Sequence, residues 1–113
     1  MHQKDQLKAD GLRGSLDLLV LKTLARGPLH GYGIAQHLLQ VTDNALHVGE
    51  SALYPALQRL LVNGWTEAEW RVSESGRRAR YYTLTPAGRK RLKQEEHEFE
   101  LMIRTVRSVL EAI

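Results

Sequence analysis

Hydrophobic residues recur at helical spacing in three segments of the first half of the chain. The first segment begins after Ser15, is apolar almost all round and ends at Gly27-Pro28, which predicts a helix in the core. The second segment, from about residue 31 to residue 41, predicts an amphipathic helix. Its apolar face consists of Ile34, Leu38 and Val41.

The third helical segment, residues 51–63, contains a proline, Pro55, among its leucines. Proline is tolerated in the first turn of a helix, where backbone N–H groups have no acceptor within the helix. We therefore expect this helix to begin at Ser51 or Ala52, with Ser51 as its cap, and to end at Asn63-Gly64. The face opposite the leucines consists of Ser51, Pro55, Gln58, Arg59 and Val62, with Tyr54 at its boundary.

Two segments rich in Trp, Tyr, Thr and Val follow, residues 65–72 and 79–85. Both show a period of two, and turn-forming residues around Gly76 separate them, so they predict a β-hairpin. One face of the first strand consists of Thr66, Ala68, Trp70 and Val72. The tip is basic, with Arg77, Arg78 and Arg80, whereas Tyr81 and Tyr82 are expected to pack within the sheet.

A long helix is predicted for the end of the chain, because Thr85 suits the cap position and Pro86 the first helical position. Its apolar stripe follows a heptad pattern and consists of Leu92, Phe99, Met102, Ile103, Val106, Val109 and Leu110. A helix of about 26 residues is about 40 Å long and would outrun so small a domain. We therefore expect the stripe to form a dimer interface with a second copy, which the helix after Ser15 could join.

Three helices followed by a hairpin with a basic tip are the elements of a winged helix-turn-helix. The predicted fold is mainly α with a small β-hairpin: a winged helix-turn-helix DNA-binding domain over residues 1–85 and a dimerisation helix over residues 86–113. In such a fold the third helix enters the DNA major groove, and a basic wing follows the backbone or the minor groove. The distribution of charge also favours DNA binding, because residues 51–93 contain nine Lys and Arg residues but only three acidic residues.

Composition excludes several other classes of protein. The chain has no cysteine, its longest apolar run is LDLLVL, and its polar start does not resemble a signal peptide, so we expect a cytoplasmic protein without a membrane contact. The five histidines lack the spacing of a metal site, and we find no catalytic triad, P-loop or dinucleotide fingerprint. We therefore expect no enzyme activity, metal or cofactor.

The segments LHGYGIAQHL, ALYPALQRLLVNGW and RRARYYTLTPAGRKRL, followed by a terminal helix, resemble the PadR family of bacterial transcriptional regulators. The resemblance covers about residues 12–93, and the chain is similar to the short members that end in one dimerisation helix. It implies a homodimeric repressor that binds an inverted-repeat operator in double-stranded DNA and responds to a small-molecule effector or another signal.

Position by position, the resemblance implies DNA contacts from the third helix, the wing and the start of the second helix. The implied DNA-binding residues are Tyr32, Ser51, Ala52, Tyr54, Pro55, Gln58, Arg59, Arg77, Arg78 and Arg80. The family usually has a glycine and then Ser or Thr before LYPAL, whereas this chain has Ser51 and Ala52. Its last helix has no tryptophan on which a flat ligand could stack.

Two other interpretations remain open from the residues alone. The chain could be a winged-helix protein-interaction module without sequence-specific DNA readout, which would bind DNA weakly and a protein partner tightly. It could also be a regulator of the MarR type, although its short length and the LYPAL segment argue against that assignment. Trp65, Phe99 and Met102 could line an effector site at the dimer interface or could be core residues.

Overall fold

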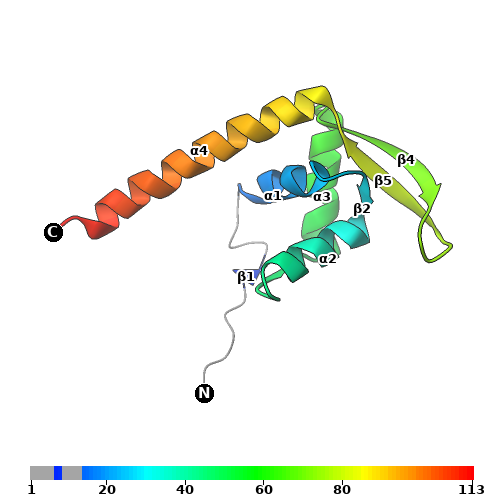
Figure 1. Cartoon of the computed structure of the whole chain (residues 1–113), viewed down its shortest axis with the longest axis horizontal. Helices are drawn as coiled ribbons and strands as arrows, with labels where there is room; N and C mark the ends of the chain where they lie inside the picture. The colour runs from blue at the N-terminus through cyan, green and yellow to red at the C-terminus, as the bar shows by residue number, and fades with distance from the viewer. Residues whose placement is uncertain (1–6, 9–13) are drawn as a thin grey trace, which may run out of the picture.

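Three short helices and a small sheet pack together, and a fourth, long helix extends away from them (Figure 1). The computed structural model describes residues 7–8 and 14–113. The helices are α1 (Leu16–Leu24), α2 (Gly31–Val41), α3 (Glu50–Val62) and α4 (Pro86–Glu111). The strands are β1 (Leu7–Lys8), β2 (Leu29–His30), β3 (Leu46–His47), β4 (Thr66–Val72) and β5 (Arg78–Leu84). This architecture confirms the predicted winged helix-turn-helix with a long terminal helix.

The core lies where α1, α2 and α3 meet, and its fully buried side chains are mostly leucine. The largely apolar character of α1 is explained by its position, since it packs against α2, α3, β5 and α4. Ile34 and Leu38 of α2 are buried as predicted, but Val41 is exposed because α2 ends there. Leu92 also belongs to this core and is only 6% exposed, so it is not available as the interface residue that the heptad pattern predicts.

The wing is part of a three-stranded antiparallel sheet with the order β2-β5-β4. The hairpin itself follows the prediction, with Thr66 paired to Leu84 at its base and Val72 paired to Arg78 near its tip. Tyr82 is buried in the sheet, and Tyr81 contacts the ring of His30 edge-on at 5.1 Å between centroids. Strands β2, β1 and β3 have two residues each, so no periodic pattern could predict them.

The start of α3 differs from the prediction. The helix begins at Glu50 with Gly49 at the cap position and without a side-chain cap, so Ser51 lies in the first turn and is not the cap. Pro55 is consequently in the second turn, where it cannot donate to the carbonyl of Ser51. The helix accommodates the proline because its ring lies on the exposed face.

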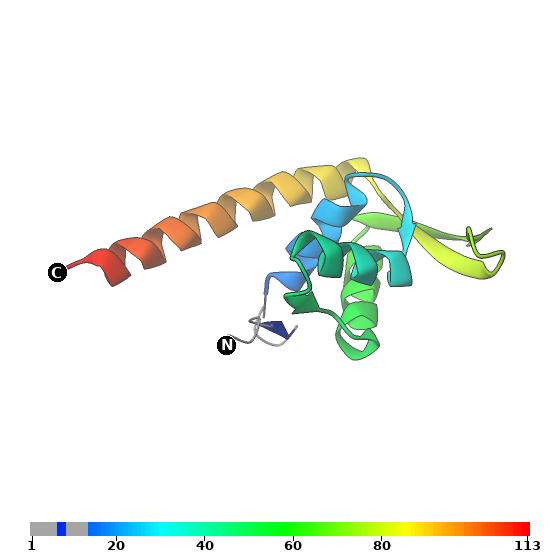
Figure 2. The same ribbon diagram turned by 60° about the horizontal axis from the view of Figure 1, so that its bottom comes forward.

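The direction in which α4 leaves the sheet is fixed by its first turn. The Thr85 hydroxyl accepts a hydrogen bond from the Gly88 amide at 3.0 Å and donates one to the Gly64 carbonyl at 2.7 Å. Gly88 packs so closely against the end of α3 that an added Cβ would lie 2.0 Å from the Trp65 carbonyl oxygen. Further along, Lys22 and Glu96 form an ion pair at 3.5 Å, and beyond it α4 extends into solvent (Figure 2).

We expect Gly88→Ala to destabilise the fold by about 2 to 4 kcal/mol, because a backbone clash cannot be relieved by rotating a side chain. The free energy of unfolding should be measured by urea denaturation at a fixed protein concentration. Ala87→Gly is the matched control, since Ala87 is exposed in the same turn and should cost about 1 kcal/mol at most. Equal stability of Gly88→Ala and the unaltered chain would contradict the close contact.

Candidate nucleic-acid interface

The exposed face of α3 carries most of the residues predicted to bind DNA. Ser51, Tyr54, Pro55 and Gln58 are all exposed, with Tyr54 at 51%. Ala52 differs from them, because it is half-buried and packs against the core. The outward face of α3 is therefore short and modestly polar, and the leucines on its other side hold it rigidly against α1.

Tyr32, Tyr54 and the wing surround a common hollow of about 410 Å³. Tyr32 is the second residue of α2 and is 72% exposed. From the wing, Trp70, Arg78 and Arg80 line the same hollow. The fold thus brings together the start of α2, the outer face of α3 and the wing, which lie far apart in the sequence.

The arginines of the wing are arranged over aromatic rings. The Arg78 guanidinium lies 5.2 Å from the centroid of Trp70, and that of Arg80 lies 5.7 Å from the centroid of Tyr82. Trp70 and Arg80 are cross-strand partners on the face of the hairpin that continues from buried Thr66 and Leu84. These cation–π contacts orient the two guanidinium groups while leaving both arginines exposed. Arg77 is exposed at the tip beside them.

Arg59 does not join this surface, although the sequence placed it with Gln58. Its guanidinium donates to both carboxylate oxygens of Asp17 on α1, at 2.7 and 3.3 Å. The hydrogen bond to Asp17 raises the pKa of Arg59 above its ordinary value; burial opposes this shift, and the negative charge of Asp17 adds to it. Arg59 therefore ties α3 to α1.

Another polar contact joins the residue after the C-cap of α1, Arg26, to His37 of α2. Arg26 lies 2.6 Å from Nδ1 of His37, a geometry that requires a neutral imidazole as acceptor. Burial, and then the positive charge of Arg26, lower the pKa of His37 below its ordinary value. Within residues 7–8 and 14–113, no group of three or more potential ligands is placed to hold a metal ion.

Sequence reasoning missed two exposed residues beside this surface, Trp70 and Glu50. Trp70 is 60% exposed because the hairpin extends beyond the helices that cover its base. The alternation along β4, which puts Trp70 opposite Arg80, was the signal that could have identified it. Glu50 was missed because the helix was predicted to start one residue later.

The predicted dimer interface on α4 is exposed from Phe99 onward within this single chain. Its uncovered residues are Phe99, Met102, Ile103, Val106, Val109 and Leu110. Phe99 and Met102 also line a hollow of about 220 Å³ against Leu18 of α1. Trp65 lies elsewhere, under the Arg91 guanidinium at 4.7 Å, so the structure does not bring the three suggested effector-site residues together.

The chain matches the transcriptional regulator PadR-like family over residues 20–94. It is similar to a transcriptional regulator of Mycobacterium tuberculosis, with 34% identity over 94 residues that cover 83% of this chain and 84% of the relative. Among solved structures, it is similar to a transcriptional regulator from Clostridium thermocellum, with a TM-score of 0.80, 33% identity and coverage of 88% and 96% of the two chains.

A PadR family transcriptional regulator from Eggerthella lenta has a TM-score of 0.78 and 30% identity, with coverage of 93% of this chain and 89% of that chain. Within the part of the chain that the structure describes, no helix combines the length and the apolar character needed to span a bilayer.

Proposed function

The chain belongs to the PadR-like family of transcriptional regulators, and on this premise we propose that it is a homodimeric repressor that binds an inverted-repeat operator in the cytoplasm. Members of the family regulate transcription and are not enzymes. One observation carries the proposal: a single hollow lies between α2, α3 and the wing, and it is lined by Tyr32, Tyr54, Trp70, Arg78 and Arg80. A DNA backbone that follows this hollow would set α3 into the major groove and the wing against the phosphates.

The exposed face of α3 would supply the base contacts. Ser51, Tyr54, Pro55 and Gln58 lie at or near its N-terminal half, which is the part of a recognition helix that reaches base edges. Arg77, Arg78 and Arg80 would contact phosphates, because guanidinium groups that are exposed and already oriented need little further ordering.

Dimerisation would occur through the uncovered stripe of α4. The stripe combines six large apolar side chains along the part of the helix that extends past the domain. Apolar residues at heptad spacing pair with a facing helix, and the simplest partner is the same helix of a second copy. Two copies would present their recognition helices about 34 Å apart, which is one turn of DNA.

Release from the operator would follow a change in the distance between the two recognition helices. An effector that favours one dimer arrangement over the other by a few kcal/mol would suffice. The hollow at Phe99 and Met102 supports such a role, because it lies where the domain meets the proposed dimer helix.

The proposed function is tested by fluorescence anisotropy with DNA from upstream of the protein's own gene and with a scrambled duplex, each at 50 and 200 mM salt. We expect at least about a thousandfold preference for the native duplex, typical of specific readers. Weak binding of equal strength to both duplexes would contradict sequence-specific repression at this site and favour a protein-interaction module. A selection from random duplexes would then distinguish an operator elsewhere from a loss of readout.

We expect Gln58→Ala to change sequence preference more than overall affinity. Gln58 is exposed on α3 and its amide can bond bidentately to adenine, which is worth about 1 to 3 kcal/mol of discrimination. The measurement is the affinity for operators substituted at each position in turn. Val62→Ala is the control, since Val62 is also exposed but lies at the far end of the helix. If the sequence preference stayed the same at every operator position, Gln58 would not contact a base.

A further inference from the structure

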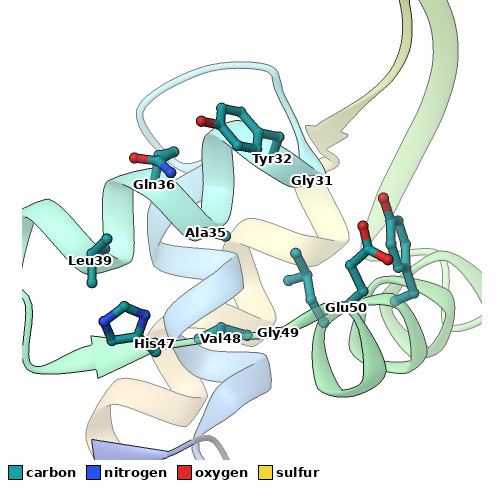
Figure 3. Close-up of a pocket in the computed structure, with 11 residues that line it drawn as sticks. Gly31, Tyr32, Ala35, Gln36, Leu39, His47, Val48, Gly49 and Glu50 are labelled. Atoms are coloured by element: carbon teal, nitrogen blue, oxygen red, sulfur yellow. The ribbon is translucent and has the colours of Figure 1, made fainter. Parts of the chain in front are cut away.

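Glu50 occupies the position on the recognition helix from which a side chain most easily reaches a base. It is the first residue of α3, is exposed, and follows a glycine that provides no side-chain cap. Figure 3 shows it at the end of α3, across an open pocket of about 270 Å³ from Tyr32 and Gln36 of α2. Tyr54 follows four residues later on the same side of the helix and lines the same pocket.

The carboxylate of Glu50 adds a negative charge to a surface that is proposed to bind the phosphates of DNA. Within the described residues, no ion pair involves Glu50, a property that it shares with Glu67, Glu74, Glu98 and Glu100. On a surface proposed to bind DNA, an unpaired carboxylate weakens the attraction for phosphate. It therefore lowers affinity for DNA of every sequence, unless a hydrogen-bond donor on a base faces it.

The major-groove edge of cytosine itself carries such a donor and no acceptor, the nearest acceptor being O6 of the paired guanine. Its N4 amino group donates to carboxylates, whereas guanine and thymine present acceptor oxygens that would repel Glu50. Adenine also has an amino donor, but its N7 acceptor lies next to it. A carboxylate at this place consequently favours cytosine and penalises the other bases.

We propose that Glu50 selects a cytosine in each operator half-site and suppresses binding to DNA that lacks it. The inference rests on the proposed function, because it assigns a role within the same interface. Both effects come from one negative charge: it accepts a hydrogen bond at the correct site and repels phosphates and acceptor atoms at all others.

A purely structural role for Glu50 is the competing explanation, since an acidic residue in the first turn stabilises a helix through its dipole. Glu50→Asp separates the two roles. Aspartate keeps the charge beside the helix N-terminus but is shorter by one methylene, so it would maintain helix stability and repulsion of phosphate while losing reach to the base.

The test combines selection from a random duplex pool with anisotropy on a scrambled duplex at 50 mM salt, for the unaltered chain, Glu50→Gln and Glu50→Asp. Glu67→Gln is the matched control, because it removes one exposed charge on β4, away from α3. We expect the unaltered chain to enrich cytosine at one position of each half-site. Glu50→Gln should lose that enrichment by about tenfold or more and bind the scrambled duplex several times more tightly.

Glu50→Asp should lose the cytosine enrichment while its binding to the scrambled duplex stays weak. Full cytosine enrichment in Glu50→Gln, with all variants equally folded by circular dichroism, would overturn the inference and leave the proposed repressor function intact. If the unaltered chain enriched no sequence at all, the proposed function itself would fail, and the inference with it.

Discussion

Replacing Arg77 and Arg78 of the wing with alanine is expected to lower affinity for every DNA sequence by about a thousandfold at 0.15 M salt. A dimer would lose four cationic phosphate contacts, each of which contributes about 0.9 to the slope of log K against log salt. The slope should therefore become shallower by about 3.6. Because these electrostatic contributions vanish near 1 M salt, the change in slope corresponds to a loss of affinity of about three decades at 0.15 M salt. Both arginines are exposed, so the fold should be unaffected.

The measurement is an anisotropy titration of operator and scrambled duplexes over a series of salt concentrations. Arg89→Ala with Lys90→Ala is the matched control, because it removes two exposed positive charges at the start of α4, away from the tip of the wing. The control should keep most of the affinity and the slope. If the wing variant kept both at physiological salt, the wing would not contact phosphate.

Replacing Ile103 and Val106 of α4 with glutamate is expected to give a monomer with at least about a thousandfold weaker operator binding, because a monomer contacts only one half-site. Both side chains are exposed in the single chain, so the substitutions leave the winged domain intact. In a dimer they would place four unpaired carboxylates in an apolar interface, which is strongly destabilising.

Mass should be measured by light scattering after size-exclusion chromatography, and binding by anisotropy on the same sample. Leu101→Glu with Ser108→Glu is the control, since it adds the same charges to the face of α4 opposite the stripe. A dimeric Ile103→Glu/Val106→Glu variant with normal operator affinity would rule out α4 as the interface. If the control variant were a monomer, added negative charge on any face of α4 would disrupt the dimer, and the result would not identify the stripe as the interface.

Several elements could be predicted from the sequence because their signals are local. The helical period of α1, α2 and α3, the alternation of β4 and β5, and the Thr85-Pro86 start of α4 are properties of neighbouring residues. The face of α3 that carries Tyr54 and Gln58 followed from the same period. The start of α3 was misplaced by one residue, because the proline was taken to mark the first turn and the fold tolerates it in the second.

Other features depend on residues that meet only in the folded chain. Arg59 faces outward on its own helix, yet it forms an ion pair with Asp17 of another helix that no local pattern could predict. Leu92 fits the heptad stripe but is buried against its own domain, because the first turns of α4 pack where Gly88 contacts the Trp65 carbonyl. Periodicity identifies an apolar face and says nothing about which neighbour covers it.

The sequence by itself determined the order and type of the main elements, the basic wing and the apolar stripe of α4, since hydrophobic periodicity and charge depend only on the order of the residues. Only the tertiary structure decided that Tyr32, Tyr54, Trp70, Arg78 and Arg80 line one hollow, and that Glu50, at the start of α3, has no ion pair among the described residues. The physical reason is that distances between elements are set by how their buried faces pack against each other, and no local pattern records them.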